Sequence, residues 1–195
     1  MPSQLSKVAA IASILFVFAQ TASAHPSPSH VSGFAAGVTH PLSGLDHLLA
    51  MIAVGLYAAQ RGGRAMWLLP ATFLLSMAIG GMAGLGGHEI PVLEQGIAAS
   101  VLVLGLMVAA GSRLPLVVAG LLISVFALFH GYAHGVELKP GFAPASYAIG
   151  FILATAMLHA VGMGLGVVTN QLTTKTLPRI AGGAIAICGV ALFWL

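Results

Sequence analysis

Long apolar runs, separated by short polar or glycine- and proline-rich breaks, make up most of this chain of 195 residues. A helix that crosses a bilayer needs about 20 mostly apolar residues, and each break contains the Gly, Pro or charge that ends a helix. The breaks fall at residues 61–64, 86–91, 112–115, 137–144 and 170–178. The pattern therefore predicts six membrane-spanning helices, at about residues 33–60, 65–86, 92–111, 114–136, 144–169 and 178–195.

An earlier apolar run has the features of a secretory signal peptide. Lys7 precedes VAAIASILFVFA, and Ala22 and Ala24 then form the small-residue A-x-A pattern of a cleavage site. We predict a signal peptide over residues 1–24, cleaved after Ala24, and a mature chain over residues 25–195 that forms one six-helix domain. An N-terminal helix that is not cleaved is the alternative.

The composition agrees with an integral membrane protein. Only 6% of the residues are charged and 58% are hydrophobic, whereas a soluble domain has roughly 25% charged residues. The 25 glycines suit helices that pack closely through small side chains. The single cysteine, Cys188, excludes an intramolecular disulfide and a CxxC metal site. The predicted fold class is an all-α integral membrane bundle without a separate soluble domain.

The cationic residues predict the orientation of this bundle. Five of them fall in alternate connections and one falls on the other side, which is a clear positive-inside bias. We predict a multi-pass protein of the bacterial inner membrane with its mature N-terminus in the periplasm. Because the cations are scattered rather than clustered, no nucleic-acid partner is expected. The five are Arg61, Arg64, Arg113, Lys175 and Arg179, and the one is Lys139.

The stretch FHGYAHGVE, residues 129–137, carries histidines at the spacing of a metal site. His130, His134 and Glu137 are at i, i+4 and i+7 and share one helical face. Two histidines one turn apart, about 6 Å along the axis, are able to grip one divalent ion. The alternative is a pair of interfacial histidines bonded to nearby carbonyls. The adjacent glycines predict a close helix contact, and we expect the first mature helix to be the neighbour.

The stretch HPLSGLDHLLAM, residues 40–51, places a carboxylate at the edge of an apolar helix. A charge at that depth is costly and marks a functional site. His40 and His47 are about 10 Å apart along a straight helix, but Pro41 predicts that the helix kinks or begins there. Either the break draws His40 towards Asp46 and His47, or His40 and His47 bind the ion at successive positions along one path. A capped helix start explains the proline but not the aspartate.

Three further residues are weaker candidates. His88 and Glu89 form a pair at the outer end of the second mature helix. His159 lies more than a dozen residues into the fifth helix. It is either a deeper metal-binding station or a histidine bonded to a neighbouring helix. The ligand set is imidazole and carboxylate without thiolate, which suits Ni, Co, Zn, Cu or Fe rather than Mg or Ca. The residues therefore predict a transition-metal site entered from outside.

The two stretches resemble the signatures of the HupE/UreJ family of nickel/cobalt permeases. HPLSGLDHLLAM has the H-x5-D-H pattern in the first mature helix, and FHGYAHGVE is similar to a second signature. The resemblance covers essentially the whole mature chain. It implies uptake of nickel for enzymes such as hydrogenase or urease, or of cobalt for cobalamin, with no prosthetic group. It also implies a metal route through His40, Asp46 and His47, with a second portion at His130, His134 and Glu137.

We therefore expect a permease that moves Ni²⁺ or Co²⁺ inward, and not an enzyme. No Walker motif is present in the chain, so nucleotide hydrolysis is not expected of it. The alternative is an intramembrane metal-dependent hydrolase with an outward-facing metal site, which needs only three ligands and a base. A structural partner in a respiratory complex is a third interpretation. The expected partners are the metal ion and the lipid bilayer, and a homo-oligomer is left open.

Overall fold

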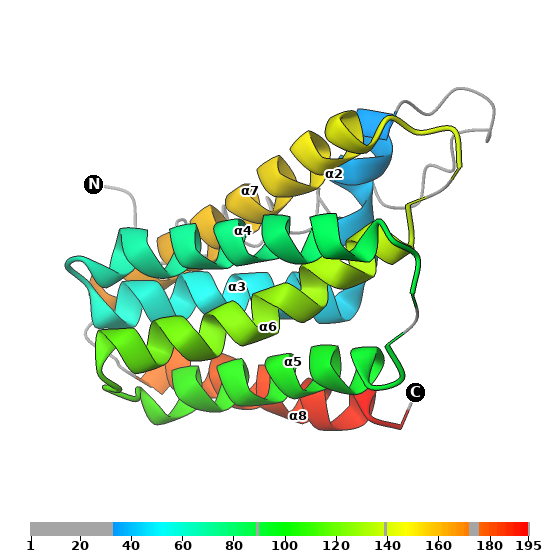
Figure 1. The fold of residues 1–195 in the computed structure, drawn as a ribbon. Coiled ribbons are helices and arrows are strands. Elements are labelled where there is room, and N and C mark those ends of the chain that lie inside the picture. Colours follow the sequence, from blue (N-terminus) through cyan, green and yellow to red (C-terminus); the bar gives the residue numbers. More distant parts are fainter. Residues whose placement is uncertain (1–32, 89, 139, 172–175, 195) are drawn as a thin grey trace. The chain divides into compact units, whose positions relative to one another are not determined.

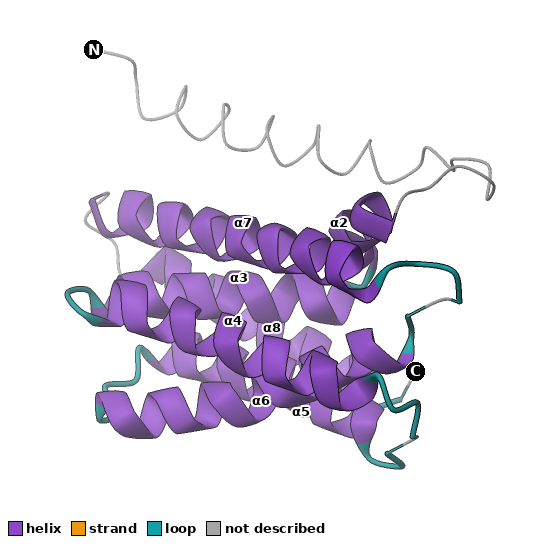
Figure 2. Ribbon diagram, turned by 45° about the horizontal axis from the view of Figure 1, so that its top comes forward, coloured by secondary structure: helices purple, strands orange, loops and turns teal. Residues whose placement is uncertain are grey.

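The computed structural model describes residues 33–88, 90–138, 140–171 and 176–194. The predicted signal peptide lies outside the described residues. All regular structure in these ranges is helical, as Figure 2 shows, so the predicted all-α class is confirmed. The helices are α2 (Gly33–Ser43), α3 (Leu45–Arg61), α4 (Ala65–Gly84), α5 (Leu93–Ala110), α6 (Leu116–Val136), α7 (Pro144–Gln171) and α8 (Thr176–Leu192) (Figure 1).

Four helices, α4 to α7, are long and apolar enough to cross a membrane, and the bent pair α2–α3 makes five if its halves form one span. The ends of these four agree with the predicted helices to within two residues. Helix α8 has 17 residues, so it is about 25 Å long, at the lower limit of a span.

The first predicted helix, residues 33–60, is wrong as a continuous element. It is divided into α2 and α3, which are bent by 80°. The break lies at Gly44, whose φ of −89° and ψ of 117° are extended, and not at Pro41, which sits buried inside the last turn of α2. Pro41 lacks a backbone N–H and so removes one hydrogen bond from α2. The loss is small there, because the last carbonyl groups of a helix have no partner within the helix in any case. The Ser43 hydroxyl donates to the His40 carbonyl oxygen at 2.8 Å and satisfies one acceptor at this end.

Helix α3 is the centre of the bundle, where it contacts α2, α4, α5, α7 and α8. Its residues from Ala53 to Ala59 are all buried, which explains why this segment is apolar on every side. The outer faces of the other helices expose large apolar side chains, among them Val117 and Ile187, which are more than 70% exposed. An apolar exterior of this kind is what a lipid environment requires.

Helix α6 packs closely against α4, side by side in Figure 1. A Cβ on Gly131 would collide with the Met77 carbonyl oxygen, and one on Gly135 with that of Gly81. The glycines of FHGYAHGVE therefore allow the approach that their pattern predicts. The expected neighbour is wrong, because this face of α6 meets α4 rather than the first mature helix. His130 and His134 directly precede these glycines, so their side chains leave α6 about 100° away from the glycine face and contact the rings of His40 and His47 on α2 and α3.

Candidate metal-ion site

The break between α2 and α3 presents a histidine and a carboxylate at the start of α3. Asp46 lies in the first turn, where a negative charge interacts favourably with the helix dipole. Its Oδ1 accepts hydrogen bonds from the His47 backbone N–H at 2.7 Å and from His47 Nδ1 at 2.8 Å. The carboxylate accepts only, so Nδ1 carries the proton and a neutral His47 keeps a lone pair on Nε2. This Nε2 is buried and has no hydrogen-bond partner among the described residues.

A serine on α5 fixes the second imidazole in the same way. The Ser100 hydroxyl donates to the Ile97 carbonyl oxygen at 2.6 Å, and Ser100 Oγ lies 2.7 Å from His130 Nε2. Since the only hydroxyl proton is committed, Ser100 accepts from His130 Nε2–H. His130 Nδ1 then carries a lone pair, and it too is buried without a partner in the described part of the chain.

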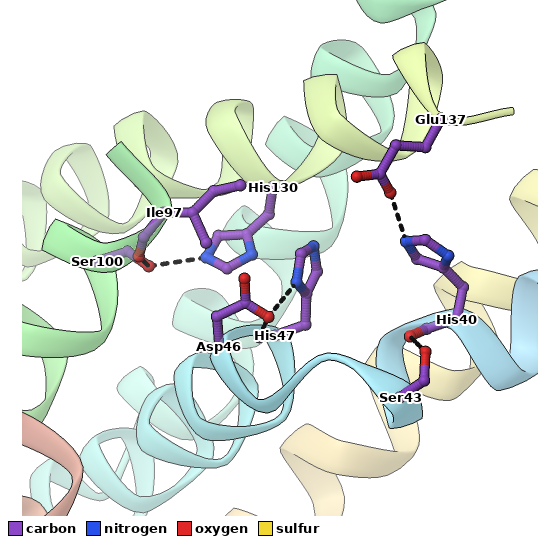
Figure 3. A network of polar contacts seen from close by, with 8 residues as sticks. All are labelled: His40, Ser43, Asp46, His47, Ile97, Ser100, His130 and Glu137. Atoms are coloured by element: carbon purple, nitrogen blue, oxygen red, sulfur yellow. Dashed lines mark hydrogen bonds and ion pairs between the residues drawn. The ribbon is translucent and has the colours of Figure 1, made fainter. Parts of the chain in front are cut away.

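Four histidine rings from α2, α3 and α6 pack against one another (Figure 3 draws three of them). His47 is central, since its ring centroid lies 4.6 Å from that of His130, 4.7 Å from that of His134 and 6.1 Å from that of His40. His134 is fully buried, and neither of its ring nitrogens has a hydrogen-bond partner among the described residues. The two sequence motifs thus meet, and the bend brings His40 and His47 close together.

His40 pairs with Glu137 at the more exposed side of this cluster. His40 Nε2 lies 2.8 Å from Glu137 Oε2, and both side chains are partly exposed, by 32% and 47%. The hydrogen bond from His40 lowers the pKa of the Glu137 carboxyl, which keeps this group ionised at neutral pH. A second carboxylate therefore lies at the more exposed side of the histidine cluster.

The rings in the structure pack edge to face rather than around a common point. Within the described residues no group of three or more His, Cys, Asp or Glu side chains has the arrangement of a metal site. Coordination of one ion by several of these imidazoles therefore requires the rings to turn.

The weaker candidates His88 and His159 take no part in the ring contacts of this cluster. His88 is exposed in the connection between α4 and α5, where its backbone carbonyl accepts from the Tyr132 hydroxyl at 2.6 Å. Glu89 lies outside the described residues. His159 is buried on α7, and neither ring nitrogen has a hydrogen-bond partner in the described ranges, so the bond to a neighbouring helix, one of the two alternatives for this residue, is not seen there. The Phe73 ring contacts both His130 and His159, with ring centroids 5.8 Å and 5.0 Å apart, respectively.

Sequence reasoning missed Ser100 and the aromatic walls of the site. Phe151 stacks on His134 with centroids 4.8 Å apart and an angle of 16°, and Tyr147 lies nearby at 6.5 Å. Ser100 carries the only hydroxyl in helix α5 and the only polar side chain beyond its first turn, and an isolated polar residue inside an apolar helix is a signal of a buried hydrogen bond. Phe151 and Tyr147 give no comparable signal, because aromatic residues are common in apolar helices whether or not they line a site.

The fold and the site together define a class: a helical protein of the multi-pass membrane type that packs three buried histidines against a fourth, partly exposed one, with two carboxylates beside them. Comparison with known sequences identifies the family, because the family model described as "HupE / UreJ protein" matches residues 13–192. The chain belongs to the HupE/UreJ family. It is 42% identical over 163 residues to Protein HupE of Rhizobium leguminosarum bv. viciae, which covers 84% of this chain and 85% of that protein. No solved structure matches the chain.

Proposed function

We propose that this protein is a permease that takes up Ni²⁺ or Co²⁺ from the periplasm into the cytoplasm. The metal path is lined by the residues of the two motifs. Membership of the HupE/UreJ family supports transport of nickel or cobalt, and favours it over an intramembrane hydrolase. The residues of the path are His40, Asp46, His47, His130, His134 and Glu137.

The observation that carries this proposal is the set of buried imidazole nitrogens that lack a partner. Leaving a polar group buried and unpaired costs about 1–3 kcal/mol, and four such nitrogens, on His47, His130 and His134, lie in one cluster. On His47 and His130 the hydrogen-bonded nitrogen faces a fixed acceptor, Asp46 or Ser100. This arrangement sets the tautomer and leaves the other nitrogen as a metal ligand.

The carboxylates supply the charge that the neutral imidazoles lack. Glu137 and His40, which are partly exposed, receive the ion from the periplasm. Asp46 offsets its positive charge beside His47, so that the desolvated ion is not left unpaired. The imidazoles of His130 and His134 then replace His40 and Glu137 as ligands of the ion. His159 is a deeper station on the same path.

The membrane potential favours this direction of movement. A potential of 100 mV, negative inside, contributes about 4.6 kcal/mol for a divalent ion, twice the value for one charge. In the proposed topology the chain crosses the bacterial inner membrane six times. The signal peptide is cleaved, the mature N-terminus is periplasmic, and α2–α3 and α8 count as spans. The connections that carry the arginines then face the cytoplasm.

Uptake of radiolabelled nickel and cobalt into proteoliposomes tests the proposal, with and without an imposed potential. Wild type should accumulate one or both ions. His47→Ala should abolish accumulation, whereas His88→Ala, which removes an exposed histidine at the same end of the bundle, should leave it unchanged. An ion that binds stoichiometrically but never enters the vesicles would contradict transport.

A further inference from the structure

A polar cavity lies at the end of the bundle opposite to the histidines. It has a volume of about 110 Å³ and is formed where four segments meet: the end of α3, the connection from α5 to α6, the end of α7 and the start of α8. The connections from α3 to α4 and from α5 to α6 both lie at this end in Figure 1. Its polar lining residues are Gln60, Arg61, Ser112, Arg113, Asn170 and Arg179.

One of the three arginines is held by the protein itself. Arg61 Nη1 donates to the Tyr57 hydroxyl at 3.2 Å and to the Leu114 carbonyl oxygen. Its guanidinium also lies 5.9 Å from the centroid of the Tyr57 ring. These contacts join α3 to the segment that precedes α6 and place a fixed positive charge at the wall of the cavity.

The other two arginines have no such partner in the part of the chain that the structure describes. Arg113 and Arg179 are exposed, and within the described residues neither forms an ion pair. Within the described residues no acidic side chain lies at this end, because Asp46 is in the first turn of α3, Glu94 is in the first turn of α5 and Glu137 directly follows α6, all at the other end of the bundle. The fourth acidic residue of the sequence, Glu89, lies outside the described residues.

Such a cavity selects an oxygen-rich anion. Guanidinium groups bind phosphate through paired hydrogen bonds, and basic pockets between helices on the cytoplasmic side of membrane proteins hold anionic headgroups. The neutral donors are partly occupied, since Gln60 Nε2 donates to the Val108 carbonyl oxygen at 3.1 Å and Asn170 Nδ2 to that of Ala59 at 3.4 Å. The arginines therefore dominate recognition, and a divalent cation is repelled.

We propose that this cavity binds a phosphate group, carried by an anionic phospholipid of the adjacent leaflet or free in solution. Arg113 and Arg179 bind the phosphate, and Arg61 supplies a preformed charge. Binding ties together the ends of α3, α5, α7 and α8, and so stabilises the fold at this end. The inference is independent of metal transport.

Thermal unfolding of the full chain in neutral detergent tests this site. Phosphatidylglycerol, phosphatidylcholine and inorganic phosphate are titrated separately, and an apparent Kd is taken from each shift of the midpoint. Arg113→Gln and Arg179→Gln should each weaken binding of the active ligand roughly tenfold, equivalent to about 1.4 kcal/mol. Arg64→Gln is the matched control, because Arg64 is an exposed arginine at the same end that does not line the cavity.

The ligands separate the two sources of phosphate. A shift with phosphatidylglycerol but not with inorganic phosphate identifies the lipid headgroup, and the reverse identifies a soluble phosphate. An equal loss in Arg64→Gln would show diffuse attraction to the basic end and overturn the site. No shift with either anion in wild type would also overturn it.

Discussion

Gly131 should be the most sensitive glycine of the α4–α6 contact to replacement by alanine. A Cβ at this position would lie 2.9 Å from the Gly81 backbone nitrogen, and closer still to the Met77 carbonyl oxygen, whereas real Cβ atoms essentially never approach within 3.0 Å. Both neighbours are backbone atoms, so no side chain is able to move aside. The helices must separate, and His130 and His134 on α6 must shift with them.

The magnitude follows from a comparison with Gly120, on the same helix. A Cβ at Gly120 meets nothing within 4 Å. Both substitutions gain the same helix propensity, about 1 kcal/mol at most, so their difference isolates the cost of overpacking, about 1–3 kcal/mol. We expect Gly131→Ala to lie at the upper end of this range, because the obstructing atoms are backbone.

The assay is unfolding of the purified protein in mixed micelles by increasing SDS, followed by circular dichroism. Gly120→Ala should unfold at or above the wild-type midpoint, and Gly131→Ala well below it. Equal midpoints for the two variants would refute the close packing of α4 on α6.

Three other predictions concern the site and the topology. Ser100→Ala leaves His130 Nε2 buried without an acceptor, at about 1–3 kcal/mol, and should reduce metal uptake while the protein stays in the membrane; unchanged uptake would show that the serine does not set the tautomer. Glu137→Gln should lower the unfolding midpoint at neutral pH. The difference from wild type should vanish as the pH falls through the lowered pKa of Glu137, since protonation of the wild-type carboxylate then removes the same charge. A difference that persists in acid would argue against an ionic contribution. In a cysteine-free background, Arg64→Cys should resist impermeant thiol reagents in spheroplasts and His88→Cys should react, and the opposite labelling would reverse the proposed orientation.

The sequence pattern predicts the helices well because their limits are set locally. Apolar length and the Gly, Pro and charged breaks decide where α4 to α7 begin and end. The same local logic misplaces the bend in the first helix, because a proline near a helix end costs less than one in the interior. The extended conformation of Gly44, three residues later, is not visible in the pattern.

The candidate site is predictable in its ligands but not in its surroundings. The spacing of His130 and His134 shows that they share a face, and Asp46 stands out by its cost in an apolar helix. Which helix each face meets depends on packing of the whole bundle, so the neighbour of Gly131 is predicted wrongly. The contact of His40 with Glu137 likewise depends on the 80° bend, of which Pro41 predicts the existence but neither the position nor the angle.

Metal uptake by variants of Asp46 tests the proposed path most directly. Asp46→Asn keeps the size of the side chain and an oxygen acceptor towards His47, but removes the negative charge beside the ion. At matched protein levels in proteoliposomes, nickel or cobalt uptake should collapse in Asp46→Asn and recover in part in Asp46→Glu, while the unfolding midpoint of each variant stays near that of wild type. Near-normal uptake by Asp46→Asn would contradict a charge-assisted path through this cluster.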